Sequence, residues 1–336
     1  MLKVTLGKTG ITVNKNGFGA LPIQRISATE AGKLLRKAYD HGVRYFDTAR
    51  AYSDSEEKIG LALSDVRQDI FIATKTMAKT GPDLRKDLEA SLKYLKTDYI
   101  DVYQFHNPPF VPRPGDENGL YDEALKAQQE GKIRFIGITN HRMKVAMEAA
   151  ESDLFATMQY PFSYLADQSE FDLVAKCVEH KIGYIAMKGM AGGLINNGRL
   201  AYAFMSGQEH VLPIWGVQKE AELDEFLDCQ DNPPILDEEM QAIIAKDRQE
   251  LVGNFCRSCG YCMPCPVGIN IPQAARMSLL LRRAPLSQNL TPATTANMQL
   301  IPKCLHCNNC KNHCPYGLDT PSLLQANYQD YLTFLK

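Results

Sequence analysis

Four residues with complementary acid–base chemistry stand where short apolar runs of the chain end. They are an acid, a phenol, an ammonium and an imidazole, namely Asp47, Tyr52, Lys75 and His106. A tyrosine hydroxyl has an ordinary pKa of about 10, which is too high for efficient proton exchange near neutral pH. A neighbouring ammonium favours the phenolate and lowers that pKa. The set therefore predicts a tyrosine that protonates a carbonyl oxygen while hydride reaches the carbonyl carbon.

Strand periodicity supports a shared location for these side chains. Lys75 falls on the same strand face as Ala73, and His106 falls on the same face as Gln104. Because an unpaired buried charge is costly, Asp47 is the predicted partner of Lys75. His106 is predicted to orient the carbonyl and to polarise it through a hydrogen bond. Any one of these residues alone is more often structural, but the four together favour a catalytic site.

Eight of the ten cysteines lie in two short runs in the last quarter of the chain. The first is Cys256-x2-Cys259-x2-Cys262-x2-Cys265-Pro, and the second is Cys304-x2-Cys307-x2-Cys310-x3-Cys314-Pro. Repeated two-residue gaps let a tight turn wrap three thiolates around one iron–sulfur cube. Cys-x2-Cys pairs also build zinc sites, but zinc has no need for three consecutive gaps that end in Cys-Pro. The runs therefore favour iron–sulfur clusters over zinc.

The elements that must position the first group of residues alternate between apolar strands and helical patterns. A capping box at residues 27–30 begins one helix, and Pro82 begins another. Eight strands are predicted, near residues 16–19, 46–47, 70–75, 102–106, 135–138, 158–160, 184–187 and 212–215. Eight βα units in about 230 residues predict an α/β fold of the closed (β/α)8 TIM-barrel type. A doubly wound sheet is the rival, but the first βα turn lacks Gly-x-Gly-x-x-Gly.

The composition is that of an ordinary globular protein. The 336 residues are 45% hydrophobic and 23% charged, with a net charge of −2. A near-neutral chain has no basic excess for phosphates, which argues against nucleic acid as a partner. No apolar run approaches the roughly 20 residues that span a bilayer, and the chain opens without a signal-peptide pattern. We therefore expect no membrane association and a cytoplasmic location.

The barrel region, up to about residue 230, resembles the aldo-keto reductases. The resemblance rests on Asp47-Thr48-Ala49-x-x-Tyr52, then Ser55-Glu56 and Gly60, then Lys75 and His106. It implies that Asp47, Tyr52, Lys75 and His106 form the catalytic tetrad. It also implies a nicotinamide dinucleotide bound across the barrel mouth without a Rossmann fold. The implied contacts with that nucleotide are Gly19, Thr139, Asn140, Gln159, Met187, Gly189, Gly192, Gly216, Gln218 and Lys219.

The chain departs from the family pattern at the nucleotide site. Met187-Lys188-Gly189 stands where the family often has an aromatic residue that stacks on the nicotinamide. A thioether can also pack against a ring. Lys219 is the one cation in the segment that the resemblance gives to the adenosine end, and it favours NADP over NAD only weakly.

The second cysteine run resembles the [4Fe–4S] run of bacterial ferredoxins. In two-cluster ferredoxins the fourth cysteine of each run binds the other cluster. The resemblance therefore gives one cluster Cys256, Cys259, Cys262 and Cys314, and the other Cys304, Cys307, Cys310 and Cys265. The predicted domains are an aldo-keto reductase barrel at 1–235, a linking helix at 236–251 and a two-cluster ferredoxin-like domain at 252–336.

The two resemblances imply a NAD(P)H-dependent oxidoreductase that reduces a small-molecule carbonyl and carries two [4Fe–4S] clusters. Nicotinamide passes a hydride, whereas a cluster passes single electrons, so coupling them directly needs a cofactor such as a flavin to split the pair. Three roles of the clusters stay open. They could stabilise the fold, exchange electrons with a redox partner protein, or exchange electrons with a further bound cofactor. The alternative function is an electron-transfer protein whose barrel holds a cofactor or docks a redox partner.

Overall fold

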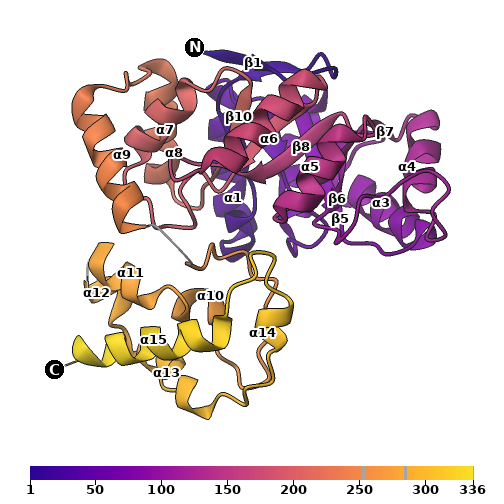
Figure 1. Cartoon of the computed structure of the whole chain (residues 1–336). Coiled ribbons are helices and arrows are strands. Elements are labelled where there is room, and N and C mark those ends of the chain that lie inside the picture. Colours follow the sequence, from indigo (N-terminus) through magenta and orange to yellow (C-terminus); the bar gives the residue numbers. More distant parts are fainter. Residues whose placement is uncertain (252–254, 284–285, 336) are drawn as a thin grey trace. The chain divides into compact units, whose positions relative to one another are not determined.

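The chain folds into two compact units. The computed structural model describes residues 1–251, 255–283 and 286–335, and Figure 1 shows its elements. The first unit comprises Met1–Gly189 and Gly198–Gln241, and the second comprises Met190–Asn197 and Ala242–Lys336. The boundary falls inside helix α9 (Glu238–Glu250), in the stretch where the sequence predicts a linking helix at 236–251.

The first unit is a closed barrel of eight parallel strands, which confirms the predicted (β/α)8 fold. The strands run in the closed order β10-β3-β4-β5-β6-β7-β8-β9. They are β3 (Gly17–Gly19), β4 (Tyr45–Asp47), β5 (Phe71–Thr76), β6 (Ile100–His106), β7 (Ile133–Thr139), β8 (Thr157–Pro161), β9 (Gly183–Met187) and β10 (Val211–Gly216). Because parallel strands end at one edge, all the predicted strand-end residues face the same rim of the barrel.

A small antiparallel hairpin precedes the barrel. It consists of β1 (Lys3–Thr5) and β2 (Thr12–Asn14). Its apolar side chains Val4, Leu6, Ile11 and Val13 are buried together with strand residues of the barrel interior. The hairpin therefore extends the barrel core with its buried apolar side chains.

Amphipathic helices follow the strands because their apolar residues recur at helical spacing, and side chains cap the first turns of some of them. They are α1 (Ala28–Asp40), α2 (Ser55–Leu63), α3 (Gly81–Leu95), α4 (Leu120–Gln129), α5 (Met143–Glu151), α6 (Gln168–Glu179), α7 (Gly198–Ser206) and α8 (Glu220–Asp231). The predicted capping box forms between Ser27 and Glu30, and Thr80 caps the helix that Pro82 begins. No helix in the described ranges has both the length and the apolar character needed to cross a bilayer.

Gly60 belongs to the aldo-keto reductase signature, and the fold gives it a packing role. A Cβ atom at this position of α2 would collide with the Tyr94 carbonyl oxygen and lie 2.8 Å from the Leu95 carbonyl carbon, at the end of α3. We expect Gly60→Ala to lower the free energy of unfolding by ~1–3 kcal/mol, because backbone cannot yield as a flexible side chain can.

Gly32 provides the matched control for that substitution. It lies inside α1, with nothing within 4 Å of the position of its missing Cβ atom. Gly32→Ala should raise the free energy of unfolding by up to about 1 kcal/mol, the difference in helix propensity. Denaturant titration of both variants measures the two effects, and equal shifts would contradict the packing role of Gly60.

The second unit is built from short helices around a compact apolar core. The helices after α9 are α10 (Ile271–Ala274), α11 (Met277–Arg283), α12 (Leu286–Asn289), α13 (Pro292–Met298), α14 (Asn309–Asn312) and α15 (Thr320–Thr333). The chain turns at Ala275 and Arg276, and this turn separates α10 from α11. The core includes Ile269, Met277, Met298, Leu324 and Tyr331.

The two cysteine runs fold as a structural repeat. Each Cys-Pro is followed two residues later by a glycine with positive φ, Gly268 at 85° and Gly317 at 64°. Each glycine amide donates a hydrogen bond to the carbonyl of the cysteine before the proline, at 2.9 Å to Cys265 and 3.2 Å to Cys314. A helix with proline in its first turn then begins in both copies, α10 and α15. The repeat therefore extends from the cysteines into the helices that carry the core.

Candidate active site and cysteine sites

Asp47 and Lys75 form a buried ion pair at the ends of neighbouring strands β4 and β5. The Lys75 ammonium lies 2.7 Å from Asp47 Oδ2 and 2.6 Å from the Thr48 carbonyl oxygen. The Lys75 side chain is only 1% exposed and that of Asp47 is 3% exposed. Burial raises the pKa of Asp47 and lowers the pKa of Lys75, and in each case the charge of the partner opposes the shift. The expected ion pair therefore forms, away from water.

The rings of Tyr52 and His106 lie at this pair. The Lys75 ammonium is 5.2 Å from the centroid of the Tyr52 ring. The rings of Tyr52 and His106 meet edge to face, with centroids 5.8 Å apart. Tyr52 comes from the loop between β4 and α2, whereas His106 ends β6. The four residues that the sequence selected from three strand ends thus lie together.

Burial and the nearby Lys75 charge lower the pKa of His106 to about 3. The imidazole is therefore neutral at physiological pH and can polarise a carbonyl by donating a hydrogen bond without carrying charge. In the unfolded chain the His106 imidazole is protonated near pH 6.5, whereas in the folded chain it stays neutral down to about pH 3. Folding stability must then fall as pH decreases from about 6.5, by ~1 kcal/mol per pH unit from this residue.

We expect His106→Asn to reduce that acid sensitivity. Denaturant titrations between pH 7 and pH 5 should show a smaller loss of stability for the variant than for the parent chain. His41→Asn is the matched control, because His41 is an exposed histidine far in sequence from His106. An unchanged slope in His106→Asn would show that His106 titrates normally in the folded chain.

Signature residues Ser55 and Glu56 fix the loop that carries Tyr52. The Ser55 hydroxyl donates to the Ala20 carbonyl oxygen at 2.9 Å and accepts from Thr48 Oγ1 at 2.9 Å. The Glu56 carboxylate is 1% exposed and pairs with Arg50 in the same loop. Its other oxygen accepts hydrogen bonds from Thr74 at 2.6 Å and Ser91 at 2.7 Å. These contacts anchor the start of α2 to the barrel and so restrain the tyrosine loop.

Gln104 is a residue of the site that the sequence analysis did not select. Its side-chain amide donates to Gln159 Oε1 at 2.8 Å and approaches Asp47 Oδ1 at 3.4 Å. Gln159 Nε2 in turn lies 3.4 Å from Asp47 Oδ2. Both glutamines therefore orient the carboxylate that holds Lys75. The sequence feature that points to Gln104 is its position two residues before His106, which places both side chains on the same face of β6.

Thr139, Asn140 and Gln159 are the residues predicted to hold the nicotinamide carboxamide. Thr139 ends β7, Asn140 follows it and Gln159 lies in the middle of β8, and all three are at most 1% exposed. Asn140 Nδ2 donates to the Pro108 carbonyl oxygen at 2.9 Å, and Gln159 Nε2 approaches Asp47. A side-chain amide has two N–H donors. Among the contacts of the described residues, the side-chain nitrogens of Asn140 and Gln159 each have one acceptor. The second N–H of each amide could therefore donate to the oxygen of a carboxamide ligand.

Three predicted nucleotide glycines lie close to other residues of the barrel. A Cβ atom at Gly19 would lie 3.1 Å from the Trp215 carbonyl oxygen, and one at Gly189 would lie 2.6 Å from the Trp215 ring. Gly216 is exposed at the end of β10 and lies beside the Pro22 ring. Gly19 and Gly189 thus have packing reasons for lacking a side chain, whether or not a nucleotide lies nearby. Met187 ends β9, with its sulfur 4.0 Å from Thr139 Oγ1.

The predicted adenosine segment leads into α8. The backbone amides of Gln218 and Lys219 donate to the Glu222 carboxylate at 2.9 Å and 3.1 Å. Lys219 is exposed, and two acidic residues, Glu220 and Glu222, follow it in the first helical turn. The carboxylate of Glu222 therefore occupies helix-start amides that could otherwise receive an anion.

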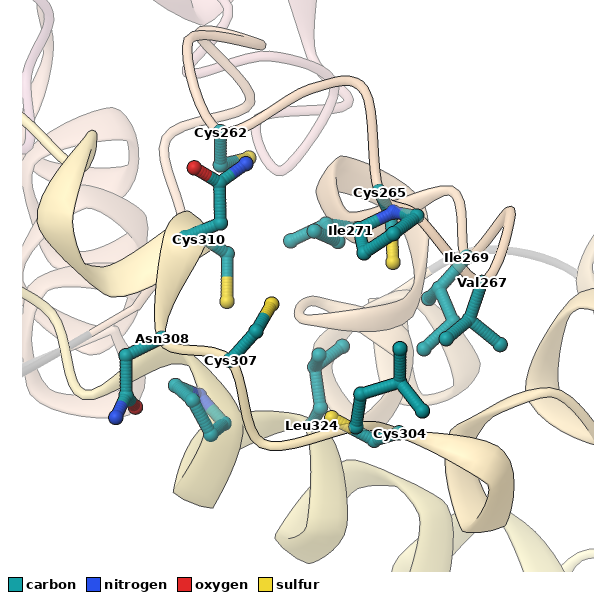
Figure 2. A pocket seen from close by; sticks show the side chains of 14 residues that line it. Cys262, Cys265, Val267, Ile269, Ile271, Cys304, Cys307, Asn308, Cys310 and Leu324 are labelled. Carbon is teal, nitrogen blue, oxygen red and sulfur yellow. The ribbon is translucent and has the colours of Figure 1, made fainter.

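The eight cysteines of the second unit surround two cavities. One cavity is lined by Cys256, Cys259, Cys262 and Cys314. The other is lined by Cys265, Cys304, Cys307 and Cys310, together with Cys262. Figure 2 shows the sulfur atoms of Cys265, Cys307 and Cys310 pointing into the second cavity. Cysteines from both runs thus line each cavity, as the ferredoxin resemblance implies.

Backbone amides reach the cysteine sulfurs in both runs. The Ser258 amide lies 3.4 Å from Cys256 Sγ, and the His306 amide lies 3.5 Å from Cys304 Sγ. Ser258 and His306 adopt positive φ values of 52° and 50°, which turn these amides toward the sulfurs. Hydrogen bonds to sulfur stabilise thiolate charge and tune iron–sulfur clusters. In the described part of the chain, no group of three or more His, Cys, Asp or Glu is arranged around a single metal ion.

Comparison with known families supports both units. The aldo/keto reductase family model matches residues 15–200, more than half of the chain. A 4Fe-4S dicluster domain model matches residues 255–319. This second match decides against the zinc alternative for the cysteine runs.

Individual relatives match the barrel region. The chain is 30% identical over 213 residues to L-galactose dehydrogenase of Arabidopsis thaliana, covering 56% of this chain and 66% of the relative. It is 29% identical over 238 residues to an uncharacterised oxidoreductase of Bacillus subtilis, covering 61% of this chain and 74% of the relative. Among solved structures, an aldo-keto reductase from Klebsiella pneumoniae in complex with NADPH matches with a TM-score of 0.63 at 23% identity, over 73% of this chain and 94% of that one.

A second solved structure, the holo form of an aldo-keto reductase from Bacillus halodurans, has a TM-score of 0.63 at 22% identity and covers 74% of this chain and 96% of that one. Such low identities establish the barrel fold alone, whereas the family model extends through the strand ends that carry Tyr52, Lys75 and His106. The chain therefore belongs to the aldo/keto reductase family of oxidoreductases and carries a 4Fe-4S dicluster domain at its C-terminal end.

Proposed function

We propose that this oxidoreductase reduces a small-molecule carbonyl with NADPH or NADH and carries two [4Fe–4S] clusters. The observation that carries the proposal is the meeting of Tyr52, Lys75 and His106 above the buried Asp47–Lys75 ion pair. A phenol between an ammonium and a neutral imidazole is suited to giving a proton to a carbonyl oxygen. A barrel used only as a scaffold gives no reason to bury a charged lysine at this position.

The roles of the tetrad follow from its contacts. The bound nicotinamide supplies a hydride to the carbonyl carbon. The Tyr52 hydroxyl gives its proton to the carbonyl oxygen, so that the product is the alcohol. The Lys75 ammonium stabilises the phenolate that remains, and Asp47 keeps Lys75 charged and oriented. Neutral His106 donates a hydrogen bond to the same carbonyl oxygen and fixes its direction.

Binding of the nucleotide is proposed at the strand ends of the barrel. The free N–H donors of Asn140 and Gln159 suit the nicotinamide carboxamide. Lys219 favours the 2′-phosphate of NADP, although Glu222 beside it weakens that preference. The thiolates of the second unit are proposed to hold two clusters, one per cavity. Reduced cysteines of this kind suit a cytoplasmic location.

Electron transfer to a partner protein is the second candidate function. The second cavity opens to the surface, because Cys307 is exposed and neighbouring Leu305 is 68% exposed. A cluster held there would lie close to a partner that docks on this surface. In this function, single electrons pass through the second unit while the barrel holds a cofactor.

An anaerobic titration tests the proposal. The purified chain is mixed with NADPH, and separately with NADH, while nucleotide oxidation and cluster absorbance are followed with and without a panel of aldehydes and ketones. The proposal expects aldehyde-dependent nucleotide oxidation without bleaching of the clusters. Cluster bleaching by nucleotide alone would favour the electron-transfer function. Failure to oxidise either nucleotide with every carbonyl, in a sample with intact clusters, would reject carbonyl reduction.

A further inference from the structure

Arg276 carries a buried charge for which the described residues offer no carboxylate. Its side chain lies at the turn between α10 and α11, and the residue is only 8% exposed. Among the ion pairs of the described residues, none involves Arg276. Arg283, one helix further on, pairs with Asp247 at 2.6 Å and Glu250 at 2.8 Å. A buried guanidinium without a compensating anion is strongly unfavourable, so the anion must come from elsewhere.

The first cysteine site supplies the missing negative charge. The guanidinium lies close to the first cysteine run, because the position of a Cβ atom on Gly192 is 3.1 Å from both Arg276 Nη1 and Ser258 Cβ, two residues after Cys256. Residues 251–318 contain six Arg and Lys but no Asp or Glu. A [4Fe–4S] cluster with four thiolate ligands carries net negative charge in both oxidation states. Arg282 and Arg283 pair with carboxylates from outside this stretch, whereas Arg276 has no such partner among the described residues, which leaves the thiolates of the nearby cysteine run as its counter-charge.

The same guanidinium holds the segment that leaves strand β9. Arg276 donates to the Gly192 carbonyl oxygen and, through Nε, to the Pro272 carbonyl oxygen at 2.9 Å. A Cβ atom at Gly192 would lie 3.1 Å from Arg276 Nη1 and 3.1 Å from Ser258 Cβ, and its φ is +68°. Ser258 is the residue whose amide reaches Cys256 Sγ. Gly192 therefore packs directly on the first cysteine run.

A second arginine anchors the same segment. Arg283 Nε donates to the Leu194 carbonyl oxygen at 2.9 Å, and Asn196 Nδ2 donates to the Arg283 carbonyl oxygen at 2.9 Å. These bonds explain why Met190–Asn197 belongs to the second unit although its neighbours in sequence belong to the first. Arg283 has its own carboxylates, so its position does not need the cluster charge.

We propose that Arg276 is a positioning residue that links the cluster held by Cys256, Cys259, Cys262 and Cys314 to the segment 190–197. Its charge is balanced by the cluster, and its hydrogen bond to Gly192 orders the segment. The inference rests on the proposed occupancy of the first cavity. Gly192 is one of the residues that the aldo-keto reductase resemblance assigns to the nicotinamide nucleotide.

Three arginine-to-methionine variants of the full-length holoprotein separate charge from anchoring. Arg276→Met removes both effects, Arg283→Met removes an anchor only, and Arg282→Met removes an exposed charge paired with Asp330. The readouts are the reduction potential of the clusters, from an anaerobic redox titration followed by electron paramagnetic resonance, and hydrogen exchange of the 190–197 amides. Neither readout depends on carbonyl turnover.

Arg276→Met is expected to shift the potential of one cluster downward, because a nearby positive charge favours the added electron. It should also speed exchange in 190–197 by ~10–100-fold, the equivalent of one lost charge-assisted hydrogen bond. Arg283→Met should speed exchange without that shift, and Arg282→Met should change neither readout. An unchanged potential and unchanged exchange in Arg276→Met would overturn the proposal, whatever the carbonyl activity proves to be.

Arg276→Lys decides the matter if Arg276→Met fails to fold with full iron. Lysine keeps the charge but lacks the forked donors of the guanidinium. The proposal expects full iron and a potential close to that of the parent, together with faster exchange in 190–197. Parent-like exchange in Arg276→Lys, or a lowered potential despite the retained charge, would refute the role assigned to the guanidinium.

Discussion

Tyr52→Phe is expected to lower carbonyl reduction by about 10²–10⁴-fold while nucleotide affinity stays near that of the parent chain. The substitution removes the hydroxyl that gives the proton but keeps the ring that meets His106 edge to face. Turnover of the best aldehyde of the panel measures the first effect, and fluorescence titration with NADPH measures the second. The loss should appear in kcat, because the proton moves only in the transition state.

Tyr52 is a cleaner target than its charged neighbours. Lys75→Met would leave the Asp47 carboxylate buried without a partner, at a cost of ~3–5 kcal/mol in stability. Loss of activity in that variant could therefore come from misfolding. Tyr94→Phe is the control, since Tyr94 is a partly exposed residue of α3 outside the tetrad. If Tyr52→Phe reduced aldehydes as fast as Tyr94→Phe, another group would have to be the proton donor.

Anaerobically purified protein should contain about eight iron atoms per chain, and Cys310→Ala should reduce that content to about four. Cys310 lies on α14 among the residues of the second cavity, and it is also part of the core of this unit. Removal of iron with a chelator should expose 255–335 to proteolysis while the barrel stays resistant, because a unit of this size needs its clusters for stability. Elemental analysis and limited proteolysis measure these two effects.

Cys177→Ala controls for the loss of any buried thiol. Cys177 is fully buried in α6 of the barrel, where burial raises the pKa of the thiol to about 12. This variant should keep its iron at the level of the parent. Iron near four atoms in the parent chain, or the same loss in both variants, would refute the assignment of one cluster to each cavity.

Local patterns in the sequence were sufficient to predict the barrel and the grouping of the tetrad, and the ferredoxin resemblance implied the way in which cysteines of the two runs combine around each cavity. Strand and helix periods are properties of neighbouring residues, so the strands ending at Asp47, Lys75 and His106 could be placed without coordinates. The closed barrel then brings their ends to one rim, because parallel strands all finish at the same edge. Cysteine spacing is equally local, since one turn of chain sets where three thiolates point.

Contacts between residues distant in sequence needed the tertiary structure. The bonds of Gln104 to Gln159 and Asp47 join three strands, and no sequence period predicts which amide faces which carboxylate. The chain turns at Ala275 and Arg276 between α10 and α11, although alanine and arginine both favour helix. The membership of 190–197 in the second unit depends on arginines more than 80 residues later. Such contacts are decided by packing and charge balance in the folded chain, which local propensity does not contain.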